Sequence, residues 1–193
     1  MSNLTTNSIE VEERFQAVPD TLVAEILEGR LYTHPRPGRP HTNAASNLLI
    51  LLGGPFRFGL SGPGGWVLLD EPELHLGPRP DKVVPDLAGW RRERMPDAAG
   101  GEETPPYYDL APDWVGEVLS PRTERVDRGK KLRVYGREGV SHVWLLNPVL
   151  RTLEVFRLER GHWLLVATYE DDDKVAAEPF EAVTLDLSLL WQG

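Results

Sequence analysis

Apolar and polar positions along the chain form short alternating runs that predict many strands and few helices. Residues 21–34, TLVAEILEGRLYTH, read as two extended runs joined at Glu28-Gly29, because glycine permits the positive φ that a tight hairpin turn requires. The runs are too short for long helices and are separated by Gly, Pro and Asp. Further strands are predicted over residues 65–70, 73–76, 83–90, 114–120, 142–148, 152–158, 163–169 and 183–191.

Two segments instead have helical patterns. Residues 41–52, HTNAASNLLILL, have the apolar spacing of a buried helix, with Thr42 or Asn43 as its N-cap and Gly53-Gly54 as its stop. A second helix is predicted to follow Pro121 and to end at Gly139. Between the strands, residues 95–113 are rich in Pro, Gly and acid without periodicity, which indicates a surface loop.

Strands on both sides of a central helix, with many hairpin-like connections, predict an α/β fold that shades into α+β. We expect a mixed central sheet flanked by helices, with a hairpin near the N-terminus and further strands near the C-terminus. A chain of 193 residues forms one substantial core, so residues 1–193 are interpreted as a single domain. Residues 1–14 are polar and are expected to form a flexible tail.

Composition narrows the classes of function. No stretch approaches the ~20 apolar residues of a membrane helix, and the polar N-terminus has no secretory signal pattern, so a cytoplasmic protein is expected. The absence of cysteine excludes disulfides and thiol chemistry. The net charge of -9 argues against a protein coated with positive charge, yet residues 122–137 contain seven of the 21 Lys and Arg. One basic segment therefore stands out in an acidic chain.

Glu117 interrupts the apolar run WVGEVLS at residues 114–120. A buried carboxylate needs a partner, a metal or a protonated state, because desolvation disfavours its charge. Asp86 lies in the strand-like run VVPDL, where Pro85 indicates an edge or a bend. The two acids are 31 positions apart, which is enough for the chain to return on an adjacent strand. Two such carboxylates could bind Mg²⁺, which prefers oxygen ligands.

A basic group close to these acids is expected on the helix that follows them. With 100° of rotation per residue, Lys131 borders the stripe of Leu132 and Tyr135 that should face the sheet. Lys130 lies about 100° away and should face solvent. Periodicity alone therefore selects Lys131 as the candidate.

Structural explanations also remain open for these residues. Asp86 can end a strand or cap a turn, and Glu117 can pair with an arginine of the basic segment. Asp127 and Lys131 are spaced for an i,i+4 ion pair. The order of the residues, with an acid on each of two strands and a basic helix directly after the second, favours a site.

The blocks PHTNAASNLL, VVPDLAGW and WVGEVLSPRTERVDRGKKLRVYGREGVSHVWLLNP resemble the Uma family of restriction-endonuclease-like proteins, which is assigned to the PD-(D/E)XK nuclease superfamily. The resemblance covers most of the chain, and residues 117–148 are its specific part. It implies that Asp86 and Glu117 are the metal ligands of the two acidic elements. The superfamily lysine stands two residues after the second acid, where this chain has Leu119. The Uma-like pattern has its lysine on the following helix, which matches Lys131.

The resemblance also implies accessory roles for three residues. Glu25 in the N-terminal hairpin would position a metal-bound water, His41 opens the first helix, and Asp127 would orient Lys131. Each has a plain alternative, because Glu25 can be an exposed strand carboxylate, His41 a cap or packing residue, and Asp127 the i,i+4 partner of Lys131.

Two functions stay open from the sequence. The first is an Mg²⁺-dependent endonuclease, with Mn²⁺ as an alternative, in which Asp86, Glu117 and Lys131 hydrolyse DNA phosphodiester bonds. The second is a non-catalytic DNA-binding or regulatory module on the same fold. A small phosphorylated substrate is a remote third option, since no Gly-rich phosphate loop is present. By analogy with the superfamily a homodimer is expected. The residues expected to bind phosphates are Arg122, Arg125, Arg128 and Lys130.

Overall fold

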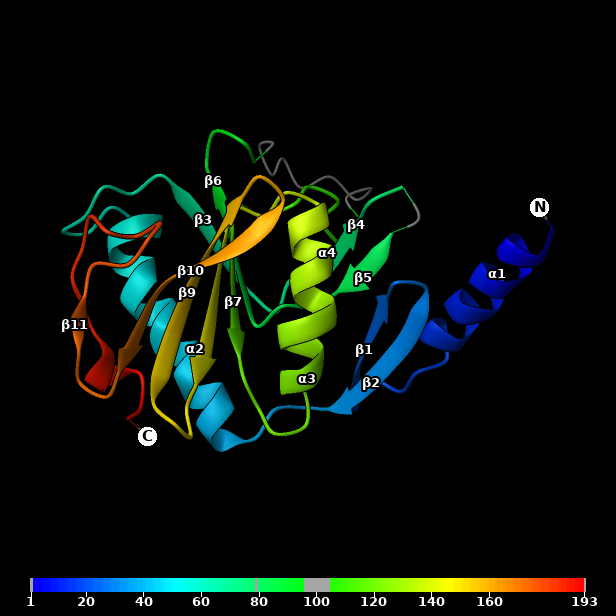
Figure 1. Cartoon of the computed structure of the whole chain (residues 1–193), viewed down its shortest axis with the longest axis horizontal. Coiled ribbons are helices and arrows are strands. Elements are labelled where there is room, and N and C mark those ends of the chain that lie inside the picture. The colour runs from blue at the N-terminus through cyan, green and yellow to red at the C-terminus, as the bar shows by residue number, and fades with distance from the viewer. Residues whose placement is uncertain (1, 79, 96–104, 193) are drawn as a thin grey trace.

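Two sheets and a few helices make up the fold, which a computed structural model describes for residues 2–78, 80–95 and 105–192. The larger sheet has six strands in the order β10-β9-β8-β7-β6-β3, and the smaller has four in the order β2-β1-β5-β4 (Figure 1). The predicted mixed sheet with flanking helices is confirmed. The larger sheet contains β3 (Trp66–Asp70), β6 (Leu87–Arg91), β7 (Trp114–Val118), β8 (His142–Asn147), β9 (Thr152–Glu159) and β10 (His162–Glu170). The smaller contains β1 (Leu22–Leu27), β2 (Arg30–Pro35), β4 (Leu74–Leu76) and β5 (Asp81–Val83).

Helical segments connect these strands. β7 and β8 run parallel, which requires a crossover, and the segment between them is the basic stretch of the sequence. No helix in the described part of the chain is long and apolar enough to cross a membrane. The helical segments are α1 (Ser2–Gln16), α2 (Arg39–Leu52), the π turn η1 (Gly53–Arg57), α3 (Glu124–Val126), the π turn η2 (Asp127–Lys131), α4 (Leu132–Arg137) and the 3-10 turn η3 (Leu187–Leu189). The short strands β11 (Lys174–Val175) and β12 (Leu185–Asp186) pair near the C-terminus.

Two hydrophobic clusters cover the two faces of the larger sheet. The first packs Leu48 and Leu52 of α2 against Trp114 of β7. The second packs Tyr135 of α4 against Val115, the next residue of β7. The three helical segments between β7 and β8, α3, η2 and α4, form one crossover helix. Successive residues of a strand point to opposite faces, so α2 and the crossover helix lie on different sides of the sheet (Figure 1). A side chain on the same side as Val115 therefore meets the crossover helix.

The predicted hairpin and helix ends are found largely where the sequence placed them. β1 and β2 pair antiparallel around Glu28 and Gly29, whose φ angles are 53° and 73°. Gly139 follows α4 with a φ of 79°, as expected for a residue that ends a helix. The positive φ angles that a tight turn and a helix end require were sufficient to predict both the hairpin turn and the end of α4.

Two boundaries were predicted incorrectly. Residues 83–90 do not form one strand: β5 ends at Val83, β6 begins at Leu87, and the two belong to different sheets. Pro85 lies between them and has no N–H for a ladder bond, so the chain bends there. The first long helix begins at Arg39 with Gly38 as its N-cap, and Gly53 continues it into η1 instead of stopping it. Proline near the start of α2 needs no N–H partner there, which explains the earlier beginning.

The chain ends also differ from the prediction. The N-terminal segment expected to be a flexible tail forms α1, and the ring of Phe15 lies 4.4 Å from the ammonium group of Lys82. Such a tertiary contact supports a helix that its own polar sequence does not indicate. Residues 183–191 form only β12 and η3, and not one strand. Of the predicted loop at 95–113, residues 96–104 lie outside the described residues, and residues 105–113 contain no named helix or strand.

Candidate active site

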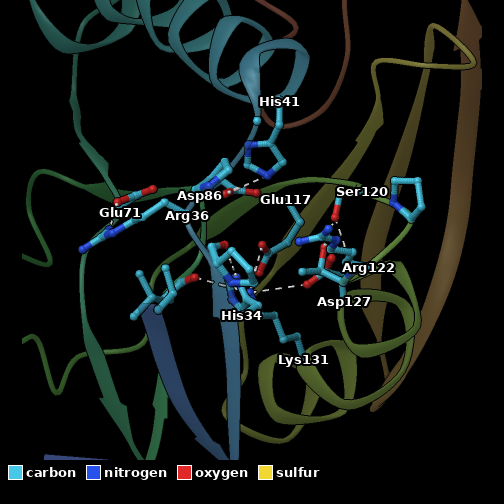
Figure 2. A pocket seen from close by; sticks show the side chains of 17 residues that line it. His34, Arg36, His41, Glu71, Asp86, Glu117, Ser120, Arg122, Asp127 and Lys131 are labelled. Atoms are coloured by element: carbon cyan, nitrogen blue, oxygen red, sulfur yellow. Dashed lines mark hydrogen bonds and ion pairs between the residues drawn. The ribbon is translucent and has the colours of Figure 1, made fainter. Parts of the chain in front are cut away.

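A cavity of about 430 Å³ lies where the hairpin, the start of α2 and the crossover helix meet β7. Asp86, Glu117 and Lys131 all line it, together with Asp127 and His41 (Figure 2). The fold therefore brings together residues that are far apart in the sequence and that were selected from it.

Asp86 occupies the bend between β5 and β6. Leu87 pairs with Gly116 in the antiparallel ladder, which places Asp86 opposite Glu117 at the end of the two strands. Oδ2 of Asp86 accepts a hydrogen bond of 2.6 Å from the backbone N–H of Val118. Oδ1 lies 3.2 Å from Nε2 of His41. The predicted adjacency of the two acid-bearing strands is confirmed.

Glu117 points to the face of the sheet that the crossover helix covers, as its neighbour Val115 does. Its side chain is 2% exposed, and both oxygens have partners. Oε2 lies 3.2 Å from Nζ of Lys131, and Oε1 accepts a 2.5 Å hydrogen bond from the hydroxyl group of Tyr135. The buried carboxylate thus has a lysine as its partner, and not an arginine of the basic segment.

Lys131 is the last residue of the π turn η2, and its side chain is 5% exposed. Its ammonium group lies 3.1 Å from Oε1 of Glu25, 3.2 Å from Glu117 and 3.4 Å from Oδ1 of Asp127. The neighbouring Lys130 is 27% exposed and pairs with Glu28 in the hairpin turn. The helical periodicity therefore identified the buried lysine correctly.

The three accessory candidates also lie at this site. Glu25 is 1% exposed, and it accepts a 2.9 Å hydrogen bond from the backbone N–H of Val84. Asp127 forms the i,i+4 ion pair with Lys131 that its spacing predicted. His41 lies in the first turn of α2, and its Nδ1 is buried without a hydrogen-bond partner in the described part of the chain. The interpretation of Glu25 as an exposed strand carboxylate is wrong.

Burial and the neighbouring charges shift the pKa values of the two buried glutamates, Glu117 and Glu25. Burial raises the pKa of Glu117 well above its ordinary value; Lys131 opposes the shift, whereas Asp127 and Asp86 add to it. Burial also acts to raise the pKa of Glu25, but Lys131, His34 and the N–H of Val84 outweigh it, so that this pKa is lowered. The two buried glutamates beside Lys131 thus have pKa values that are shifted in opposite directions.

The lysine stays protonated in this environment. Burial acts to lower the pKa of Lys131, but Glu117, Glu25 and Asp127 outweigh it and hold the pKa well above its ordinary value. Burial raises the pKa of Asp127, and nearby Asp86 and Glu25 act in the same direction. The site therefore holds more negative groups than its one buried cation can neutralise.

Two residues of the cavity were missed in the sequence. His34 lies on β2 with Nε2 3.8 Å from Oε2 of Glu25, and this nearby carboxylate raises the pKa of the imidazole. The hairpin register could have revealed it, because Glu25 pairs with Tyr32 and His34 is the next residue on the same face. Arg36 follows β2, lines the cavity and forms a 3.0 Å ion pair with Glu71. Its position depends on how the loop to α2 folds, which no local pattern shows.

The four residues expected to bind phosphates fall into two groups. Arg122 and Arg125 are exposed, and Arg122 lines the cavity. Arg128 pairs with Glu124 and Glu154, and Lys130 pairs with Glu28. Only the first two therefore offer a guanidinium group that is not already paired within the described residues.

The carboxylates have the chemistry of a magnesium site without forming a complete one. Within residues 2–78, 80–95 and 105–192, no group of three or more His, Asp and Glu side chains is arranged to hold a metal ion. Mg²⁺ typically binds one or two carboxylates and completes its shell with water and substrate phosphate. Asp86 and Glu117 fit this pattern, because they line one cavity from the bend before β6 and from the adjacent strand β7.

A mixed sheet that places Asp86, directly before β6, and Glu117, on the adjacent strand β7, at one cavity is typical of a nuclease-like fold. The chain belongs to the Uma2 family, described as "Putative restriction endonuclease", which matches residues 12–189. A solved structure with the same fold is a "putative nuclease belonging to DUF820" from Anabaena variabilis ATCC 29413. It is 22% identical, the match covers 93% of this chain and 96% of that chain, and the TM-score is 0.73. No curated protein matches the chain.

Proposed function

We propose that this protein is a metal-dependent endonuclease that hydrolyses phosphodiester bonds in DNA. One observation supports the proposal most strongly: Asp86, directly before β6, and Glu117, on the adjacent strand β7, line one cavity, and Glu117 contacts the buried Lys131. Paired carboxylates beside a fixed cation suit phosphoryl chemistry, in which metal binding and charge stabilisation do most of the work. Membership of the Uma2 family supports the same reaction class.

The charges around the cavity favour Mg²⁺ as the cofactor, with Mn²⁺ as a substitute. Four carboxylates line the cavity against three cations, Arg36, Arg122 and Lys131. The lining carboxylates are Glu71, Asp86, Glu117 and Asp127. These carboxylates, when ionised, would repel a phosphodiester, and a divalent cation that entered with it would offset the repulsion. Asp86 and Glu117 would hold that cation, which when bound activates water and polarises the phosphate.

Lys131 would act as a fixed positive charge and not as a base. Its raised pKa keeps the ammonium group protonated at neutral pH, so it has no lone pair with which to accept a proton. Glu25 and Asp127 hold the group beside Glu117. There it would stabilise the negative charge that develops on the phosphate during in-line attack by water.

A second function is favoured by a different observation. Both oxygens of Glu117 are already bound, by Lys131 and Tyr135, and Leu119 stands where the superfamily places its lysine. A carboxylate satisfied in this way can be purely structural. The alternative is a DNA-binding or regulatory module that has the nuclease fold without its activity.

Calorimetry and plasmid cleavage would distinguish the two functions. Mg²⁺ and Mn²⁺ would be titrated into wild type, Asp86→Ala, Glu117→Ala and Glu159→Ala, where Glu159 is an exposed carboxylate on β9 outside the cavity. The proposal expects metal binding and nicking of supercoiled plasmid to be lost in the first two variants and retained in Glu159→Ala. DNA binding by the wild type without metal uptake or nicking would support the non-catalytic module instead.

A further inference from the structure

Most of the basic segment serves to hold the crossover helix in place. Lys130 and Arg133 both contact Glu28, at 3.1 Å and 2.9 Å, and thereby join the helix to the hairpin turn. Arg128 contacts Glu154 on β9 at 2.5 Å. Arg137 pairs with Asp81 and Glu138. These cations already have carboxylate partners, and a DNA phosphate would have to displace them.

The arginines after β6 are also engaged within the protein. The guanidinium group of Arg91 lies 4.2 Å from the ring centre of Trp66. Arg92 donates hydrogen bonds to the backbone oxygens of Arg57 and Trp66, at 3.1 Å and 3.0 Å. Arg94 contacts Asp113 at 2.5 Å. None of these three is among the residues that line the cavity.

Arg36 and Arg122 differ from all of these residues. Both line the cavity, and Figure 2 shows them on opposite sides of Asp86 and Glu117. Arg36 is 56% exposed, and its partner Glu71 is 37% exposed. An exposed ion pair of this kind contributes little to stability, so Arg36 can readily exchange the Glu71 carboxylate for another anion. Arg122 is exposed and forms no ion pair within the described part of the chain.

We infer that Arg36 and Arg122 bind the phosphates on either side of the phosphodiester that lies over Asp86 and Glu117. The nucleic-acid strand would run across the cavity from the loop after β2 to the turn before α3. This inference rests on the proposed nuclease function, and it replaces Arg128 and Lys130 as phosphate-binding residues. Guanidinium groups suit the task because their planar forks bind phosphate through two parallel hydrogen bonds.

The positions of Arg36 and Arg122 also offset the negative charge of the carboxylates that line the cavity. Its carboxylates repel a polyanion at the point where the metal must bind, whereas the two guanidinium groups attract the flanking phosphates at the sides. Contacts to phosphate fix the position of a strand but carry no sequence information. Arg36 and Arg122 would therefore set the register of the strand over the acids, and not a base preference.

The experiment measures DNA affinity by fluorescence anisotropy for wild type, Arg36→Ala, Arg122→Ala, Arg128→Ala and Lys130→Ala. Labelled single-stranded and double-stranded oligonucleotides would be titrated at several KCl concentrations with Ca²⁺, an oxygen-seeking divalent cation, in place of Mg²⁺. Thermal unfolding of each variant checks the fold, and Arg36→Lys and Arg122→Lys retain the charge without the fork.

Arg36→Ala and Arg122→Ala are expected to weaken binding about tenfold each, in line with the loss of one charged hydrogen-bonded contact. Each should also reduce the slope of log affinity against log salt by about one. The lysine variants should recover part of the affinity. Arg128→Ala and Lys130→Ala should leave affinity and slope unchanged.

Unchanged affinity and slope in Arg36→Ala and Arg122→Ala, in protein that folds normally, would overturn this inference and leave the nuclease function intact if the wild type nicks plasmid. Loss of affinity in the Arg128 and Lys130 variants alone would overturn it in favour of the helix surface. A wild type that neither binds nor nicks DNA would overturn the proposed function, and this inference with it.

Discussion

The hydroxyl group of Tyr135 donates a hydrogen bond of 2.5 Å to Oε1 of Glu117 and so links the crossover helix to the middle of the larger sheet. Lys131, four residues earlier on the same helix, binds the other oxygen of this carboxylate. Two side chains from one helical turn thereby fix both oxygens of one acid. The orientation of Glu117 toward the cavity depends on this pair.

Tyr135→Phe is expected to lower the free energy of unfolding by about 1–3 kcal/mol, because it leaves a buried carboxylate oxygen without its donor. The lost bond also lowered the pKa of Glu117, so its removal raises that pKa further. A metal ligand must be deprotonated, and half-maximal Mg²⁺ uptake should therefore require a higher pH than in wild type. Urea unfolding and calorimetry across a pH series would measure both effects. Identical metal uptake at every pH would show that Tyr135 does not tune the acid.

Glu117→Gln and Glu25→Gln are expected to change stability in opposite directions. The folded pKa of Glu117 is raised, so its ionised form destabilises the fold as pH rises through that pKa. Glu117→Gln should therefore raise the free energy of unfolding near neutral pH. The folded pKa of Glu25 is lowered, so its contribution is present above the unfolded value of 4.5 and is lost as pH falls through the folded pKa.

Glu25→Gln should therefore lower the free energy of unfolding near neutral pH, by about 1–3 kcal/mol, because the buried lysine and the N–H of Val84 lose a charged partner. Denaturant unfolding of the two glutamine variants, side by side at neutral and acidic pH, is the measurement. A loss of stability of equal size in both would contradict the opposite pKa directions.

Lys131→Met and Lys130→Met form a matched pair of adjacent substitutions. Lys131→Met removes the cation shared by three buried carboxylates and should cost about 3–5 kcal/mol near neutral pH. The cost should shrink as pH falls, because the carboxylates then become protonated. Lys130 lies at the surface beside Glu28, and its replacement should leave stability close to wild type. Thermal unfolding at several pH values compares them, and equal losses would mean that Lys131 is not the electrostatic centre of the site.

Glu28→Gln tests the contact between the hairpin turn and the helix. Hydrogen bonds from Arg133 and Lys130 lower the pKa of Glu28 from 4.5 to about 2. The stabilisation is therefore complete above 4.5 and disappears as pH falls toward 2. Since the pair is exposed, Glu28→Gln should cost less than about 1 kcal/mol near neutral pH. Unfolding curves of variant and wild type should converge in acid, and a difference that persists there would assign the effect to something other than charge.

The sequence was informative where the determining forces are local. Alternation and turn residues predicted the hairpin at Glu28-Gly29 and the strand around Glu117, and helical periodicity separated Lys131 from Lys130. Local patterns did not show the partners of the basic segment. The helical wheel places Lys130 in solvent, but it does not show that the carboxylate partners of Arg128 and Lys130 come from β9 and from the hairpin turn. Only the tertiary structure shows that both side chains already have carboxylate partners.

The same limit explains the missed boundaries. Residues 83–90 have the composition of one strand, and only the pairing of β5 with β1 and of β6 with β7 shows that they belong to two sheets. The bend at Pro85 separates β5 from β6 and also positions Asp86 at the cavity. The same bend therefore explains both the incorrect strand prediction and the position of this acid.

The π turn η2 makes the crossover equivalent to an α-helix with one residue inserted, since its hydrogen bond spans five residues instead of four. Deleting one residue from this turn would restore an ordinary helix and rotate one half of the crossover against the other by about 100°. Either Lys131 and Tyr135 would lose their contacts with Glu117, or Arg128 would lose its contact with Glu154 on β9. The extra residue thus allows one helix to contact the buried Glu117 through Lys131 and Tyr135 and, at the same time, Glu154 on β9 through Arg128.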